Sequence, residues 1–304
     1  MSLLEKFTSL LPNRLKAIFQ DFYKKILPFI ELTRLNRPIG IYLLLWPTIA
    51  GLWIASAGSP TPSLVTIFIL GTVVMRSAGC CINDFADHQL DGTVERTKNR
   101  PLVNGRLKRS DALFCFSLFS SIGFILVLFT NSETIFLSFG AIAVIAVYPF
   151  AKRYTNLPQL ILGIAFSWGI LMTFTATKGN ITQIAFLLFI ANILWTIAYD
   201  TQYAMVDREF DIKIGVKSTA ILFGDSDRIV IGLLHTGFIA TLFLVALQLQ
   251  FGLVYYISLG IASLLLSYQH YLIKDRQPDL CFRAFLNNNW VGLVIFLGTL
   301  LHYL

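Results

Sequence analysis

Residues 62–95 read PSLVTIFILGTVVMRSAGCCINDFADHQLDGTVE, an apolar run that ends in a cluster of acids. An apolar run of about 20 residues is long enough to cross the hydrocarbon core of a membrane as a helix. Carboxylates are costly beside hydrocarbon, so acids at the end of such a run mark a candidate functional site. The stretch therefore predicts a membrane-spanning helix with a site at one end.

The rest of the chain is also apolar. Of its 304 residues, 56% are hydrophobic and only 13% are charged, whereas about a quarter are charged in an ordinary soluble domain. Apolar runs near spanning length recur at 39–57, 62–83, 112–130, 133–150, 158–177, 181–203, 229–248, 252–268 and 286–304. We therefore predict an all-α integral membrane protein with nine transmembrane helices in one domain over residues 39–304.

The first 38 residues form a separate segment. Apolar residues recur there at helical spacing from Leu4 to Ile26, with lysine and arginine residues between them. This pattern predicts a basic amphipathic helix that lies on the membrane surface. An ordinary packed helix would show the same pattern, so both interpretations are kept.

Lysine and arginine residues are distributed unevenly along the chain. With the N-terminus in the cytoplasm, 22 of the 24 fall in segments on that side. Cytoplasmic loops of membrane proteins carry such an excess. We therefore predict a multi-pass protein of the bacterial inner membrane whose acidic clusters face the cytoplasm. The net charge of +7 then reflects membrane orientation, and nucleic-acid binding is not expected.

A second acidic cluster shares the spacing of the first. Three acids of the first cluster have an acidic counterpart 116 positions later: Asp84, Asp91 and Glu95 correspond to Asp200, Asp207 and Asp211. Ser110-Asp111 and Ser226-Asp227 share this offset and precede new apolar runs, where we expect them to cap helix N-termini. We predict two parallel four-helix repeats followed by a ninth helix, with both acidic clusters on one face of the membrane.

The acids of each cluster share one side of a helix if the helix continues through the cluster. Asp84, Asp87 and Asp91 are spaced i, i+3, i+7, and Asp200, Asp207 and Asp211 are spaced i, i+7, i+11. Acids stacked in this way repel one another unless a cation binds between them. Oxygen ligands are typical of Mg²⁺, which often binds together with phosphate. A solvated helix end explains the pattern less well, because acids are disfavoured at helix C-termini.

Basic residues follow each acidic cluster. They are Arg96, Lys98 and Arg100 after the first, and Arg208, Lys213 and Lys217 after the second. Further polar groups on the same side surround Lys152 and Arg34. Acids that hold a metal ion and bases that contact phosphate oxygens together indicate a diphosphate site. The alternative for the basic residues is simple anchoring at the membrane surface.

Two stretches resemble the aspartate-rich motifs of the UbiA-type membrane prenyltransferases. They are residues 83–91 (NDFADHQLD) and residues 199–207 (YDTQYAMVD). The flanking segments 37–40 (RPIG), 75–80 (MRSAGC), 100–102 (RPL) and 217–220 (KSTA) also match, and the resemblance runs from residue 31 to the C-terminus. It is strongest to the branch of the family that prenylates 4-hydroxybenzoate in ubiquinone biosynthesis.

The resemblance implies a Mg²⁺-dependent enzyme with cytoplasmic active-site loops. Its substrates would be 4-hydroxybenzoate and a long polyprenyl diphosphate, joined at the ring carbon beside the hydroxyl. The implied metal ligands are Asp84, Asp87, Asp91, Asp207 and Asp211. The implied substrate-binding residues are Arg37, Arg96, Arg100, Tyr148, Lys152, Arg153, Tyr203 and Lys213. The implied catalytic residues are Asp200, which would orient the phenol, together with Asp87 and Asp207.

The chain departs from the family pattern at two positions. His88 stands where the family commonly has arginine, and Phe210 stands where it commonly has an acid. The first change weakens an expected charge contact, and the second removes one candidate ligand. Other members of the family, such as a haem farnesyltransferase or a naphthoate prenyltransferase, remain alternatives. A metal-coupled transporter is a further alternative, although its charged residues would lie nearer the middle of the membrane.

Overall fold

The computed structural model of the chain describes residues 13–92 and 97–304. The elements in chain order are α2 (Asn13–Leu32), α3 (Ile39–Ala55), α4 (Pro62–Asp91), α5 (Arg109–Val127), α6 (Ser132–Tyr154), α7 (Pro158–Lys178), α8 (Gln183–Ala204), α9 (Arg208–Ile214), α10 (Thr219–Phe223), the 3-10 turn η1 (Gly224–Ser226), α11 (Asp227–Gln248), α12 (Leu253–Leu272) and α13 (Pro278–His302). The described part of the chain is therefore all-α, as predicted.

Each predicted apolar run overlaps one long helix, and the ends of run and helix differ by up to eight residues. These helices are α3, α4, α5, α6, α7, α8, α11, α12 and α13. By length and apolar composition, seven spans within the described residues are suited to crossing a membrane, and α3 is a shorter apolar helix. The chain is a multi-pass membrane protein, whereas nine spans and two repeats stay predictions.

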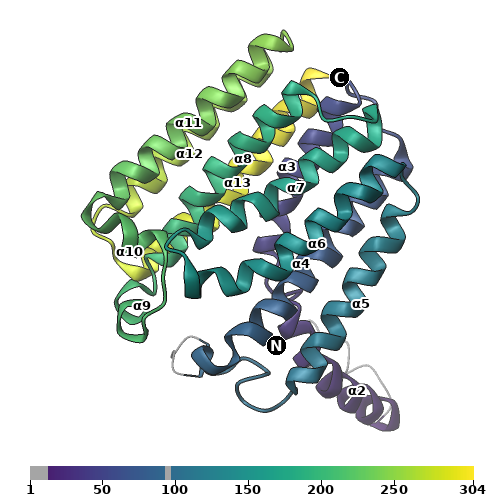
Figure 1. Cartoon of the computed structure of the whole chain (residues 1–304), viewed down its shortest axis with the longest axis vertical. Helices are drawn as coiled ribbons and strands as arrows, with labels where there is room; N and C mark the ends of the chain where they lie inside the picture. The colour runs from purple at the N-terminus through teal and green to yellow at the C-terminus, as the bar shows by residue number, and fades with distance from the viewer. Residues whose placement is uncertain (1–12, 93–96) are drawn as a thin grey trace.

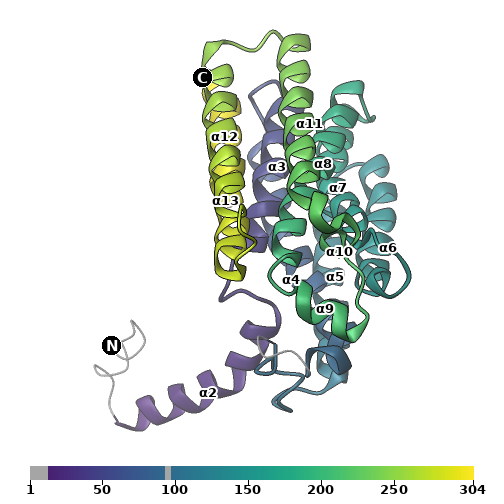
Figure 2. The same ribbon diagram turned by 90° about the vertical axis from the view of Figure 1, so that its left-hand side faces the viewer.

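The long helices stand side by side as one bundle (Figures 1 and 2). Helix α3 packs against α4, α7 and α13, so the first and last long helices are neighbours. The C-terminus lies at one end of the bundle, and α2, α9 and α10 lie at the other (Figure 2). Because α4 and α8 both reach that second end, it also holds the two acidic motifs.

Helix α2 extends sideways from this end of the bundle (Figure 2). The side chains of Leu15 and Phe22 are 53% and 59% exposed, so one part of its apolar surface has no cover from the bundle. Residues 1–12 of the predicted amphipathic segment lie outside the described residues. Binding of this segment to a membrane surface stays a prediction.

Local signals explain where several helices begin and end. The side chains of Asn131 and Thr182 precede α6 and α8, and each accepts a hydrogen bond from a backbone N–H three residues later. Pro158 opens α7, where its missing N–H is no loss. Gly179, with a φ of 71°, ends the same helix in the left-handed region.

The prediction that Ser110-Asp111 and Ser226-Asp227 cap helix N-termini holds in part, because Asp111 caps α5. Helix α5 begins after Lys108. The backbone N–H of Lys108 donates to the carboxylate of Asp111 at 2.8 Å, so the acid of the pair caps the helix. At α11 the side chain of Ser226 makes no capping hydrogen bond. Asp227 instead accepts hydrogen bonds from two arginines, because its buried charge requires stronger partners than a backbone amide alone.

The largest apolar core lies between α3, α7, α8, α11, α12 and α13. Trp195, which is 1% exposed, stands near its centre. Its ring stacks on Phe238 with the centroids 5.4 Å apart and meets Tyr199 edge to face at 5.3 Å. Aromatic contacts of this kind stabilise a core beyond the area they bury.

A chain of hydrogen bonds crosses the interior from α8 to α12 and α13. The indole N–H of Trp195 donates to Asn288 at 2.7 Å, and the amide of Asn288 donates to Gln202 at 3.1 Å. Gln202 in turn donates to Gln269, which donates to Asn287. Interhelical hydrogen bonds of this type fix the register of packed helices in an apolar medium. They hold α8, which carries part of the second acidic motif.

We predict that Asn288→Ala lowers the stability of the folded protein by about 1–3 kcal/mol, because it leaves the buried Trp195 N–H unpaired. The measurement is the melting temperature of the purified protein in detergent. Ser267→Ala is the matched control, since that hydroxyl bonds only within its own exposed turn. Equal melting temperatures for the two variants would contradict the prediction.

Candidate active site

Two adjoining cavities open at the end of the bundle that holds the acidic motifs. The larger has a volume of about 450 Å³ and is lined by α3, α4, α6, α7, α8, α13 and the connection after α4. The smaller, of about 190 Å³, lies toward α9 and α10. The residues that line both are Asn83, Thr97, Arg100, Tyr148, Asp200 and Tyr203. These shared residues mark where a molecule in one cavity meets a molecule in the other.

The first acidic motif lies on the last turns of α4. This helix continues past its apolar run to Asp91, as the spacing of the acids requires. Asp84 and Asp87 are 1% and 3% exposed. Asp84 lines the larger cavity and Asp87 the smaller, so neighbouring acids of one motif face different spaces. The side chain of Asp91 lies outside what the structure describes.

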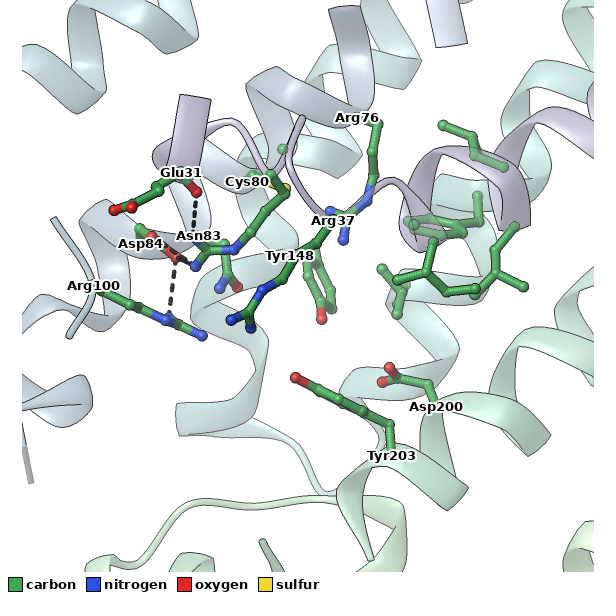
Figure 3. Close-up of a pocket in the computed structure, with 18 of the residues that line it drawn as sticks. Glu31, Arg37, Arg76, Cys80, Asn83, Asp84, Arg100, Tyr148, Asp200 and Tyr203 are labelled. Atoms are coloured by element: carbon green, nitrogen blue, oxygen red, sulfur yellow. Dashed lines mark hydrogen bonds and ion pairs between the residues drawn. The ribbon is translucent and has the colours of Figure 1, made fainter. Parts of the chain in front are cut away.

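Both described acids of this motif have basic partners. Arg34 reaches the two carboxylate oxygens of Asp84 at 2.9 Å each. Arg100 reaches one of them at 3.0 Å (Figure 3). Lys152 of α6 forms an ion pair with Asp87. Such pairing is necessary because an unpaired charge in a low-dielectric interior is strongly destabilising.

The second acidic motif does not lie on one continuous helix. Helix α8 ends at Ala204 and α9 begins at Arg208, so the predicted single stripe of acids is wrong. Asp200 lines both cavities, while Asp207 and Asp211 line the smaller one, which Asp87 also lines. The break between the helices therefore still leaves acids of the two motifs around a shared space.

The break is held by an ion-pair cluster behind α9. The guanidinium of Arg208 pairs with Asp227 of α11, and that of Arg276 reaches the same carboxylate at 2.8 Å. Asp227 is fully buried. Because Arg208 directly follows Asp207, this cluster fixes the position of Asp207 and of Asp211 on α9.

The predicted substrate-binding residues fall into three groups. Residues that line at least one cavity are Arg37, Arg100, Tyr148, Lys152 and Tyr203. Residues that line neither are Arg153 and Lys213: both are exposed, and Arg153 donates to the carbonyl of Ala86. Arg96 lies outside the described residues. In Figure 3 the Arg37 and Arg100 side chains extend into the larger cavity, toward the side where Tyr148 and Tyr203 lie.

Arg76 is a site residue that sequence reasoning did not single out. It lies within the apolar part of α4 and lines the larger cavity. Its Nε has no hydrogen-bond partner within the described structure. The guanidinium stands 5.6 Å from the centre of the Phe166 ring. A Cβ at Gly40 would lie 2.3 Å from Nε, so the glycine of the RPIG segment provides room for this side chain. A charged residue inside a span was the available signal.

Aromatic side chains form one wall of the larger cavity. Tyr199 and Tyr203 of α8 and Phe282 and Phe285 of α13 all line it. The rings of Tyr203 and Phe285 lie 4.7 Å apart between centroids. Faces of such rings attract positive charge. The wall therefore suits a reacting carbon that develops cationic character beside an apolar chain.

The acids of the smaller cavity match the ligand preference of Mg²⁺ in type. Asp87, Asp207 and Asp211 offer hard oxygen donors from two sides. In the arrangement described, no three His, Cys, Asp or Glu side chains form a group that could hold a metal ion. Asp87 is engaged with Lys152, so binding a cation would require that contact to rearrange.

The fold and the site together define a membrane prenyltransferase. The sequence pattern of the UbiA prenyltransferase family matches residues 44–296, and the chain belongs to that family. The 4-hydroxybenzoate octaprenyltransferase of Pseudomonas aeruginosa (strain LESB58) is 54% identical over 275 residues, which cover 90% of this chain and 93% of that protein. The protein of the same name in Hahella chejuensis (strain KCTC 2396) is 51% identical over 290 residues, covering 95% and 97%.

Solved structures confirm the fold. The apo structure of a UbiA homologue from Aeropyrum pernix K1 matches with a TM-score of 0.78 at 24% identity, covering 87% of this chain and 98% of that one. A UbiA homologue from Archaeoglobus fulgidus bound to GPP and Mg²⁺ matches with a TM-score of 0.67 at 17% identity, covering 91% and 99%. At these identities the likeness concerns the fold alone.

We predict that Asp227→Asn lowers the stability of the protein by about 3–5 kcal/mol, because two arginines lose a buried charge partner. Melting temperature in detergent is the readout. Asp225→Asn removes the same charge from an exposed position two residues away and should melt like the wild type. A melting temperature of Asp227→Asn equal to that of the control would show that the cluster does not hold α9.

Proposed function

We propose that this protein transfers a polyprenyl group from polyprenyl diphosphate to the ring carbon of 4-hydroxybenzoate beside the hydroxyl, in ubiquinone biosynthesis. The relatives that share about half of its sequence carry the name 4-hydroxybenzoate octaprenyltransferase. The observation that carries the proposal is the pair of adjoining cavities. The smaller cavity combines acids and bases, as a metal–diphosphate site does, and the larger one has a half-buried arginine and aromatic walls.

The smaller cavity is the proposed diphosphate site. Asp87, Asp207 and Asp211, with Asp91, would hold Mg²⁺, the ion bound with GPP in the Archaeoglobus homologue. When bound, Mg²⁺ supplies Lewis-acid stabilisation of the charge on a departing diphosphate.

Basic side chains assist the diphosphate. Lys152 and Arg100 line this cavity and donate hydrogen bonds to phosphate oxygens. Arg96 belongs to the same basic segment by sequence. Arg153 and Lys213 lie outside the cavities and act, in this proposal, by attracting the anionic substrate toward the opening.

The larger cavity is the proposed site of the acceptor. A benzoate is an anion, and it needs a cation that does not already serve another group. Arg76 is half-buried and lines this cavity, and Arg37 reaches the same space from its exposed side. We therefore assign the main contact with the substrate carboxylate to Arg76 and a supporting one to Arg37. This revises the sequence-based assignment, which named Arg37.

The reaction takes place where the cavities meet. Asp200 and Tyr203 line both, and Asp200 orients the phenol hydroxyl so that the neighbouring ring carbon faces the donor. A carbon–carbon bond forms as the bond from the prenyl carbon to diphosphate oxygen breaks and diphosphate leaves, and a base takes up the proton that the ring carbon loses. Tyr203 and Phe285 present aromatic faces that stabilise positive charge on the prenyl carbon by about 0.5–2 kcal/mol each.

The remaining features support a membrane enzyme with a lipid-soluble product. Apolar residues of α3 and α7 line the larger cavity and give the prenyl chain an apolar path. The distribution of lysine and arginine supports a site that faces the cytoplasm in the inner membrane. The segment before α3 would lie on the membrane surface. Residues 97–106 contribute to the cavity walls and help to exclude water, which would hydrolyse the cationic carbon.

The direct test is an incubation of the purified protein with 4-hydroxybenzoate, prenyl diphosphates of several lengths and Mg²⁺, followed by product identification by mass spectrometry. We expect one prenyl group on the ring and loss of product after chelation with EDTA, because the diphosphate then has no counter-ion. A product that forms only on haem or on a naphthoate would refute the substrate assignment. Metal-dependent flux across liposomes without product would favour the transporter.

We predict that Arg76→Met raises the KM for 4-hydroxybenzoate about tenfold or more, the effect of losing one charge-assisted hydrogen bond. The KM for prenyl diphosphate should change little. Arg37→Met should show a smaller effect on the same constant, because that side chain is exposed. The measurement is steady-state kinetics with each substrate varied. Equal changes in both KM values would remove Arg76 from the acceptor site.

A further inference from the structure

Asp84 has the contacts of an ion-pair centre. It is 1% exposed, and its two oxygens accept three hydrogen bonds from two guanidinium groups, those of Arg34 and Arg100. A carboxylate offers about four lone-pair positions to donors. Three of those of Asp84 are thus occupied by donors that carry positive charge, and a metal ion would have to displace them.

Asp84 also lines a different cavity from the proposed metal ligands. The smaller cavity is lined by Asp87, Asp207 and Asp211, whereas Asp84 lines the larger one. Asp84 and Asp87 are three residues apart on α4, and their basic partners differ in kind. Asp87 pairs with a lysine of α6, and Asp84 with arginines of the segments before α3 and after α4.

The two arginines connect separate parts of the chain at Asp84. Arg34 lies just after α2, and its backbone is in the left-handed region with a φ of 58°. Its side chain also donates a hydrogen bond to the carbonyl of Glu31. Arg100 belongs to the connection between α4 and α5. A second ion pair between the same segments joins Arg106 to Glu31 at 2.6 Å. The end of α2, the end of α4 and the connection after α4 are therefore fixed to one another around Asp84.

The position of the arginines gives this arrangement a chemical consequence. Both line the larger cavity, and Arg100 also lines the smaller one. One carboxylate and two guanidinium groups leave a net charge of +1 at the boundary between the cavities. Because a guanidinium presents five N–H donors in a fixed plane, holding one edge on a carboxylate sets the direction of the others.

We infer that Asp84 is a positioning residue that holds Arg100 toward the diphosphate, with Arg34 as its second partner, and that it is not a metal ligand. The inference rests on the proposed function, because it concerns how the diphosphate is bound. It assigns different roles to acids of the same motif: Asp87 serves the metal ion, and Asp84 serves the arginines. Arg34 thereby becomes a residue that holds Asp84 in place, which the motif alone does not identify.

The test compares Asp84→Asn with Asp87→Asn, the same substitution three residues apart on one helix. The first measurement is Mn²⁺ binding to the purified full chain in the absence of pyrophosphate, followed by electron paramagnetic resonance. Asp84→Asn should bind Mn²⁺ like the wild type, whereas Asp87→Asn should bind it about tenfold more weakly or worse. Loss of Mn²⁺ binding in Asp84→Asn to the extent seen in Asp87→Asn would overturn the inference.

The second measurement separates positioning from a general structural role. In Asp84→Asn the KM for prenyl diphosphate should rise about tenfold or more, while the KM for 4-hydroxybenzoate stays near that of the wild type. Arg34→Gln and Arg100→Gln leave the carboxylate in place and should show the same change with normal Mn²⁺ binding. These two variants also decide the matter if Asp84→Asn does not fold.

The outcomes distinguish the inference from the function on which it rests. Wild-type KM values for prenyl diphosphate in both arginine variants would overturn the role of Asp84. Wild-type Mn²⁺ binding in Asp87→Asn would instead refute the proposed metal site. In that case the KM of the Asp84 and arginine variants still decides whether Asp84 positions the arginines.

Discussion

Carboxylates buried at the edge of a membrane require their own counter-charges, and this requirement organises the site end of the protein. Among the described residues, Asp84, Asp87 and Asp227 are at most 3% exposed, and each pairs with lysine or arginine. Water cannot solvate them there, and the attraction between opposite charges grows as the effective dielectric constant falls. A partner is therefore a condition for folding as well as for chemistry.

The partners come from distant parts of the chain. Arg34 and Asp84 are 50 residues apart, Lys152 and Asp87 are 65 apart, and Arg276 and Asp227 are 49 apart. Each pair therefore joins helices or connections that the sequence separates. Asp84 and Asp227 each pair with two arginines. The cluster around Asp84 lies within the first acidic motif, and the cluster around Asp227 lies behind the second. The same electrostatic device thus holds both halves of the site in place.

The separation of the site into two cavities gives it two different environments. The smaller one gathers oxygen donors and cations, which suits a metal ion and a diphosphate. The larger one combines a half-buried arginine with aromatic and aliphatic walls, which suits an anionic aromatic acceptor beside a hydrocarbon chain. Six residues border both, so the reacting atoms can meet while the charged and apolar parts of the substrates remain apart.

The sequence by itself determined the all-α membrane class, the position of every long helix, the family and the two acidic motifs. It could do so because apolar runs and acids at their ends are local patterns, which a helix converts directly into positions along its axis. Only the tertiary structure decided that Asp84 and Asp87 face different cavities, that the chain breaks between α8 and α9, and that Arg76 points into the larger cavity. Those features depend on ion pairs and packing between helices far apart in sequence, and no local pattern encodes which charge will find which partner.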